Sequence, residues 1–198
     1  SHGIAVVEDN AHGIFGKYRQ KYLGTWGQLA TLSFHETKNI SCGEGGALLI
    51  NDPKYVERAL VIREKGTNRD RYFRGEVDKY SWVDIGSSYL PSELLAAVLF
   101  AQLEQHEKIQ SKRKLVWDTY FSALKPWAIK QGIGLPFVSD ECEQAYHMFY
   151  LLMPSLAVRQ ALIQHLKKSD ILSVFHYIPL HLSDMGKRWG GKSGDCPV

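Results

Sequence analysis

Three residues of different chemistry follow short apolar runs in the first part of the chain. Asp9 comes soon after Ile4–Val7, Ser33 lies at the end of a second apolar run, and Lys38 comes five residues later. In an α/β sheet, ligands gather at the carboxyl ends of the strands. The sequence therefore predicts that an acid, a hydroxyl and a lysine converge on one edge of a sheet.

This combination of groups suits pyridoxal 5'-phosphate (PLP). The lysine amine can form a Schiff base with the cofactor aldehyde, and an aspartate can pair with the protonated pyridine nitrogen. Hydroxyl and backbone N–H groups can hold the phosphate. Each residue also has an ordinary interpretation, since an aspartate after a strand often caps a turn and a lysine in a polar loop is usually a solvated charge. The spacing alone leaves these alternatives open.

Other kinds of site find no support in the sequence. His35 and Glu36 begin like a zinc-binding HExxH helix, but Asn39 stands where the second histidine is needed. Gly43–Gly46 is too short for a Walker phosphate loop, and the chain has no G-x-S-x-G nucleophile elbow. The three cysteines are far apart and form no C-x-x-C pair, which favours a reducing compartment. We therefore expect no metal site and a cytoplasmic protein.

The composition is that of an ordinary globular protein. The 198 residues are 44% hydrophobic and 23% charged, with a formal net charge of +3. This balance argues against disorder and against a dedicated nucleic-acid binder. No apolar stretch reaches the roughly 20 residues that cross a bilayer, so we expect no membrane partner.

The apolar runs predict an α/β fold in the first half of the chain. Ile4–Val7, Leu29–Phe34 and Ala47–Ile50 are typical of strands in a parallel sheet, the first buried on both faces. Asp52 and the proline after it indicate the start of a helix that ends near Lys65. Residues 66–91 form a long polar loop without clear periodicity.

The pattern of apolar and polar residues changes in the second half of the chain. A long helical stretch begins near Ser92 and is expected to end at Pro126. Two strands, His147–Met153 and Ile171–Phe175, are predicted around a helix over 155–168, which suggests a separate α+β unit. We therefore expect part of the large domain in 1–91, connecting helices in 92–126 and a small domain in 127–198. The abrupt ends favour a part of a longer protein.

Several segments together resemble the DegT/StrS family of fold type I PLP enzymes, most of which are nucleotide-sugar aminotransferases. The resemblance begins with Val7–Gly13, Leu32–Asn39 and Gly43–Ala47, and it continues through Arg63–Asn68, Phe73–Gly75, Asp78–Tyr80, Asp84–Tyr89 and Val174–His181. It implies a partial three-layer αβα large domain followed by a smaller α+β domain. It also implies that family members extend beyond both ends of this chain.

The resemblance also implies roles for individual residues. Lys38 matches the Schiff-base lysine, Asp9 the partner of the pyridine nitrogen, and Ser33 a phosphate-binding serine. His12 falls where the family usually has glutamine near the cofactor's 3-hydroxyl. Ser88 falls where many relatives place an asparagine that reaches the phosphate of the neighbouring subunit, which implies a homodimer.

The implied activity is transfer of an amino group from glutamate to C4 of a dTDP-4-keto-6-deoxy sugar, in polysaccharide biosynthesis. Sister sugar dehydratases replace the lysine by histidine, so Lys38 favours the transaminase. A non-catalytic remnant or interaction module that keeps the fold is the alternative from another class. Lys38 favours the enzyme, whereas the absence of a Gly/Thr-type phosphate loop favours the remnant.

Three further sets of residues have open roles. His176, Tyr177 and His181 follow a predicted strand and are expected either to line the sugar pocket or to be structural. The basic residues between Arg63 and Arg74 can meet a diphosphate or form a solvated loop. His147 precedes an apolar run and is expected to be a packed core residue.

Overall fold

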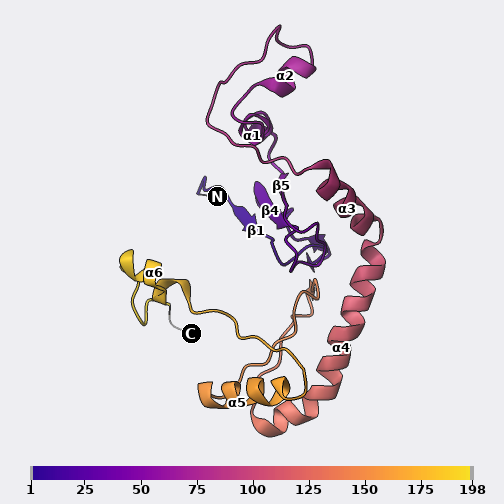
Figure 1. Ribbon diagram of the computed structural model, residues 1–198, viewed down its shortest axis with the longest axis vertical. Coiled ribbons are helices and arrows are strands. Elements are labelled where there is room, and N and C mark those ends of the chain that lie inside the picture. Colours follow the sequence, from indigo (N-terminus) through magenta and orange to yellow (C-terminus); the bar gives the residue numbers. More distant parts are fainter. Residues whose placement is uncertain (1, 197–198) are drawn as a thin grey trace. The chain divides into compact units, whose positions relative to one another are not determined.

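The computed structural model describes residues 2–196, which form two compact units. The first holds the chain up to Gln131 together with Leu135–Leu151, and the second holds Gly132–Gly134 together with the chain from Leu152 onward. Figure 1 shows the order of their elements along the chain. Within the described residues, no helix combines the length and the apolar character that a membrane span requires.

A three-stranded mixed sheet forms the centre of the first unit. Its strands are β1 (Val7–Asp9), β4 (Leu29–Ser33) and β5 (Gly46–Ile50), in the order β1-β4-β5. β1 runs parallel to β4, whereas β5 runs antiparallel to β4. The prediction of an all-parallel sheet is therefore wrong for its third strand. The connection from β4 to β5 contains no helix, and parallel strands need a long crossover that such a connection does not supply.

The first strand differs from the expected one in position and burial. β1 begins at Val7, and Val6 and Val7 are 52% and 59% exposed. Val6 instead forms hydrogen bonds with Gln28. The Val6 N–H donates to the Gln28 side-chain oxygen at 2.6 Å, and the Gln28 N–H donates to the Val6 carbonyl at 3.0 Å. The predicted burial on both faces is wrong, since Val7 and Asp9 are exposed and Glu8 is half-buried. Within the described residues, β1 pairs with β4 and forms one edge of the sheet.

A second small sheet joins parts of the first unit that are far apart in sequence. β2 (Lys17–Tyr18) pairs antiparallel with β3 (Lys21–Tyr22) and with β6 (Cys142–Glu143). The Lys17 ammonium and the Glu143 carboxylate lie 2.9 Å apart across this pairing. The segment around residue 142 is thereby fixed beside the loop that follows β1.

The helices after β5 begin at the predicted cap. The carboxylate of Asp52 accepts from the Lys54 N–H at 3.2 Å, and the 3-10 helix η1 (Pro53–Tyr55) leads into α1 (Val56–Arg63). The expected loop that follows contains a short helix, α2 (Arg69–Phe73).

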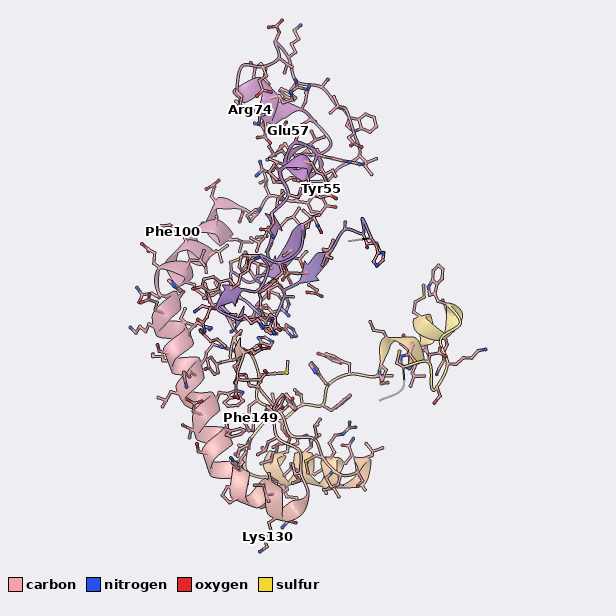
Figure 2. All side chains as sticks on the ribbon, turned by 180° about the vertical axis from the view of Figure 1, so that it is seen from behind. Tyr55, Glu57, Arg74, Phe100, Lys130 and Phe149 are labelled. Atoms are coloured by element: carbon pink, nitrogen blue, oxygen red, sulfur yellow. The ribbon has the colours of Figure 1, made fainter. Side chains whose placement is uncertain are left out.

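The basic residues of this region are paired with carboxylates. Figure 2 shows Arg74 and Glu57 close together, and their nearest charged atoms are 3.0 Å apart. The remaining pairs are Arg63 with Asp70, Lys65 and Arg69 with Glu64, and Arg71 and Arg74 with Glu76. Each of these cations is paired with a carboxylate of the same chain, so the structure favours an ion-pair network over a diphosphate site.

Two successive helices, α3 (Glu93–Glu104) and α4 (His106–Gln131), complete the first unit. The predicted start near Ser92 is confirmed, and the Ser92 hydroxyl caps α3 by accepting from the Leu95 N–H at 3.3 Å. Leu95 and Leu99 of α3 and Ile109 of α4 pack against the small core that follows β4. Both helices therefore support the loop between β4 and β5 (Figure 1).

The prediction that Pro126 ends the helix is wrong, because α4 continues to Gln131. A proline inside a helix removes one hydrogen bond and costs about 3 kcal/mol. Ala128, which lies beyond Pro126 in the same helix, has no exposed surface. Because proline lacks only its own N–H, the residues after it can still donate to earlier carbonyls, and α4 continues to Gln131.

The second unit holds three short elements. They are α5 (Leu156–Lys167), η2 (Leu180–Leu182) and α6 (Asp184–Arg188). The helix expected over 155–168 is confirmed as α5, and the Ser155 hydroxyl caps it by accepting from the Val158 N–H at 3.3 Å.

The predicted strands His147–Met153 and Ile171–Phe175 are absent from the strands of the described chain. A strand requires a neighbour that receives its N–H and C=O groups over several residues. Of these residues, Leu152 alone forms a bridge, with Gly134.

Candidate cofactor site

The carboxyl ends of β1 and β4 lie side by side because these two strands are parallel. Asp9, the last residue of β1, stands opposite Thr31, and the Asn10 N–H donates to the Thr31 carbonyl at 3.1 Å. Ser33 lies two residues further along β4 and is its last residue. The sheet therefore places an acid and a hydroxyl at the ends of neighbouring strands.

A tight turn after β4 carries the lysine. The Lys38 N–H donates to the His35 carbonyl at 2.9 Å, and the His35 N–H donates to the Ser33 hydroxyl at 3.4 Å. The turn therefore holds Lys38 a short distance beyond the end of β4. Lys38 itself is half-buried.

The next residue, Asn39, anchors this turn to distant parts of the first unit. Its buried side-chain amide donates to the Ala145 carbonyl at 2.5 Å and to the Gln110 side-chain oxygen at 3.3 Å. Gln110 belongs to α4, so the lysine turn is tied both to that helix and to the segment after β6. Ile40, which follows, is fully buried.

Two histidines from distant segments lie face to face at this place. The rings of His12 and His147 are stacked with centroids 4.1 Å apart and an angle of 24° between their planes. The Nδ1 atom of His147 lies 2.9 Å from the side-chain oxygen of Asn39. A half-buried hydrogen-bonded imidazole thus replaces the packed core residue that the sequence suggested for His147.

Charge and burial keep the His147 ring neutral. The pKa of His147 is lowered to about 4, mostly by burial and in addition by the neighbouring charges of His12, Lys38 and Arg113. The Arg113 guanidinium is held against this segment by donating to the Tyr146 carbonyl at 3.0 Å and to the His147 carbonyl at 2.7 Å.

The acid before Asp9 has a structural role. The Glu8 carboxylate accepts from the backbone N–H groups of Gly24, Trp26 and Gly27 at 2.7, 2.6 and 2.6 Å. Burial acts to raise the pKa of Glu8, but these three hydrogen bonds outweigh it and lower the pKa below its usual value. Glu8 thereby fixes the connection that brings β4 beside β1.

Asp9 itself is exposed and offers an oxygen to a ligand. One of its carboxylate oxygens accepts from the Ala11 N–H at 3.1 Å, and Asp9 forms no ion pair in the described part of the chain. The Lys38 amine likewise forms no ion pair there. The Asp9 carboxylate at the end of β1 and the Lys38 amine in the turn after β4 are not consumed by ion pairs within the described residues, and their chemistry fits the ring nitrogen and the aldehyde of PLP. The Ser33 hydroxyl at the end of β4 is chemically suited to a phosphate.

The structure does not bring Ser88 into this cluster. Its backbone forms an antiparallel bridge with Glu64, just after α1. Among residues 2–196, no group of three or more His, Cys, Asp or Glu side chains is arranged to hold a metal ion.

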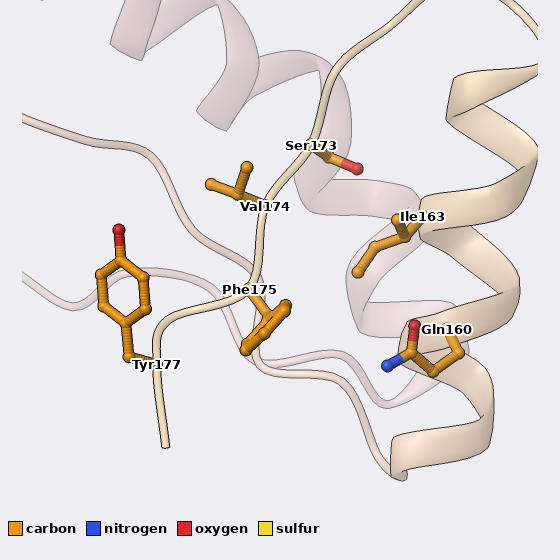
Figure 3. Close-up of a pocket in the computed structure, with 6 residues that line it drawn as sticks. All are labelled: Gln160, Ile163, Ser173, Val174, Phe175 and Tyr177. Carbon is orange, nitrogen blue, oxygen red and sulfur yellow. The ribbon is translucent and has the colours of Figure 1, made fainter. Parts of the chain in front are cut away.

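The three residues expected at a sugar pocket lie in the second unit. The rings of His176 and Tyr177 are 6.0 Å apart, and His181 belongs to η2. Tyr177 lines a hollow of about 340 Å³ between α5 and the segment after it, together with Gln160, Ile163, Ser173, Val174 and Phe175 (Figure 3). This lining is mostly apolar, and neither of the two histidines contributes to it.

Sequence reasoning missed the contribution of Asn39 and misread that of His147. No motif links these positions, which are 108 residues apart in the chain. The one available signal is the pairing of an asparagine directly after the candidate lysine with an isolated histidine before an apolar run. That signal is too common to identify a contact.

Known proteins are similar to this chain in sequence and in fold. Residues 1–198 match the model of the DegT/DnrJ/EryC1/StrS aminotransferase family. The chain is 32% identical over 184 residues to dTDP-3-amino-3,4,6-trideoxy-alpha-D-glucose transaminase of Streptomyces venezuelae, a match that covers 92% of this chain and 45% of that protein. The chain spans about half the length of the curated relatives it matches.

Solved structures show the same fold. The crystal structure of S. venezuelae DesV in complex with a ketimine intermediate matches with a TM-score of 0.83 and 30% identity, over 98% of this chain and 49% of that one. The PLP form of Spr1654 from Streptococcus pneumoniae matches with a TM-score of 0.82 over 94% of this chain and 47% of that one, and its 23% identity speaks for the fold alone. The architecture is thus a partial α/β domain of the fold type I PLP-dependent aminotransferases. The chain belongs to the DegT/DnrJ/EryC1/StrS aminotransferase family.

Proposed function

We propose that this chain carries the lysine-bearing part of a PLP-dependent nucleotide-sugar aminotransferase. The observation that carries the proposal is the placement of Lys38 just beyond the end of β4, beside the parallel strand that ends in Asp9. Membership of the aminotransferase family supports it.

Each side chain of the cluster has a task in this proposal. When bound, PLP supplies an electron sink for the carbon that gains or loses the amino group. Asp9 would pair with its pyridine nitrogen, Ser33 would donate to its phosphate, and His12 would donate a hydrogen bond to its 3-hydroxyl. Lys38 would hold the cofactor covalently through its aldehyde carbon. The same amine would then move a proton between C4 of the sugar and C4′ of the cofactor.

The substrate part of the proposal rests on sequence similarity. The motifs of this chain resemble those of dTDP-4-amino-4,6-dideoxygalactose transaminase, and a related dTDP-sugar transaminase is 32% identical. We therefore propose glutamate as amino donor and a dTDP-4-keto-6-deoxy sugar as acceptor, with a product used in polysaccharide biosynthesis. His176, Tyr177 and His181 are the proposed sugar contacts. Ser88 is the proposed contact with the cofactor phosphate of a second subunit in a cytoplasmic homodimer.

Covalent trapping of the cofactor tests the proposal. The purified chain would be incubated with PLP, its visible absorption recorded, the adduct reduced with borohydride, and the modified peptide mapped by mass spectrometry. We expect a single phosphopyridoxyl group on Lys38 and its loss in Lys38→Ala. The exposed Lys130 at the end of α4 (labelled in Figure 2) provides the control, since Lys130→Ala should be labelled like the original chain. Scattered labelling of surface lysines that Lys38→Ala leaves unchanged would refute the proposal and favour a non-catalytic remnant.

A further inference from the structure

The hydrogen bonds around Asn39 determine which way its amide points. Its NH₂ group faces two acceptors, the Ala145 carbonyl and the Gln110 side-chain oxygen. If the amide were turned over, its oxygen would face a carbonyl oxygen at 2.5 Å, which is repulsive. The Asn39 oxygen therefore points to His147 and acts as an acceptor.

This orientation fixes the tautomer of His147. A nitrogen that lies 2.9 Å from an acceptor must carry the hydrogen, so Nδ1 of His147 is the protonated nitrogen. A neutral ring with its proton on Nδ1 has a lone pair on Nε2. The ring is also stacked on His12, and its backbone carbonyl is held by Arg113. Its orientation is thus determined from three sides.

We propose that His147 is a positioning residue, a neutral imidazole locked by Asn39 that holds the His12 ring and the Lys38 turn in place at the strand ends. The proposal deepens the proposed function, since it rests on His12 and Lys38 being the residues that face the cofactor. Asn39 couples the two parts, because it is the residue after Lys38 and the hydrogen-bond partner of His147.

Neutrality is essential to this role. The charges of Lys38 and Arg113 act on His147, and His12 stacks on its ring. A protonated His147 would add a cation against the flat face of His12 and beside the amine that must react. The neutral ring gives His12 an apolar support without that repulsion.

Imidazole nuclear magnetic resonance provides a test that is independent of catalysis. Long-range ¹H–¹⁵N spectra of the full chain, recorded against pH, report the tautomer and the titration of each histidine. We expect His147 with its proton on Nδ1 and a titration midpoint near 4. A proton on Nε2, or a midpoint near the ordinary value of about 6.5 in the original chain, would overturn the proposal.

A second pair of variants tests positioning. His147→Phe keeps an aromatic ring for His12 but loses the N–H donor, whereas His165→Phe makes the same change on α5 in the second unit. We expect the Lys38 amide to exchange with solvent about tenfold faster in His147→Phe, and PLP to bind about tenfold more weakly, with no change in His165→Phe. Equal exchange in all three chains would overturn the proposal.

The proposed function and the positioning role of His147 can be refuted independently. If the original chain takes up no PLP, the proposed function is refuted, while the histidine spectra and the Lys38 exchange rates still decide whether His147 positions the turn. If PLP labels Lys38 but His147→Phe changes neither exchange nor affinity, the proposed function stands and the positioning role is refuted.

Discussion

Acid should destabilise the first unit through His147, and the replacement His147→Phe should remove that part of the pH dependence. The ring titrates near 4 in the folded chain because burial and the charges of His12, Lys38 and Arg113 disfavour its cation. In the unfolded chain its pKa is about 6.5. The unfolded state therefore binds more protons at acid pH, and the contribution of the neutral ring is lost as the pH falls from about 6.5 towards 4.

The size of this effect follows from the two pKa values. A difference of about 2.5 pKa units corresponds to about 3.4 kcal/mol when the titration is complete. Between pH 7.5 and pH 5, the same values give a loss of about 2 kcal/mol. Because the ring is only half-buried, solvent screening reduces the expected loss to about 1 to 2 kcal/mol.

Urea unfolding at the two pH values measures this quantity. The free energy of unfolding would be determined for the original chain and for His147→Phe at pH 7.5 and at pH 5. Carboxylates and the other histidines titrate in both chains, so their contributions cancel in the difference between the two pH dependences. We expect the original chain to lose about 1 to 2 kcal/mol more than the variant. Parallel pH dependences would refute the reasoning, because they would show that His147 titrates alike in the folded and unfolded chains.

Two further predictions concern the backbone around the site. Glu8→Gln replaces a carboxylate that accepts three backbone N–H groups. We expect urea unfolding to show a free energy of unfolding lower by about 1 to 3 kcal/mol at pH 7, and a smaller difference as the pH falls through about 4.5. An unchanged unfolding midpoint at pH 7 would contradict this prediction. Gly66→Ala places a Cβ 1.8 Å from the Asp84 carbonyl oxygen at a φ of +74°, whereas Gly75→Ala meets nothing at a φ of +72°. The free energy of unfolding, measured by thermal unfolding, should therefore fall by about 1 kcal/mol for Gly75→Ala and by clearly more for Gly66→Ala. Equal losses would rule out the close approach of Gly66 to the Asp84 carbonyl.

Local chemistry determined several elements from the sequence alone. Ser92 and Ser155 cap α3 and α5 because a hydroxyl before an apolar periodic run satisfies the free N–H groups of the first turn. The acid at the end of β1, the serine at the end of β4 and the lysine soon after it also follow from the alternation of apolar runs and polar strand ends. These features depend on residues close together in the chain, so they are visible in the sequence.

The remaining features depend on which distant segments meet, and only the tertiary structure decided them. The helix α4 continues past Pro126, and the pairing of β5 with β4 reverses the expected strand direction. The contact of Asn39 with His147 arises because β6 pairs with β2 and the chain after it packs along α4. Such long-range contacts leave no periodic signal, because a single asparagine or histidine has the same local pattern whether its partner is solvent or a residue 108 positions away.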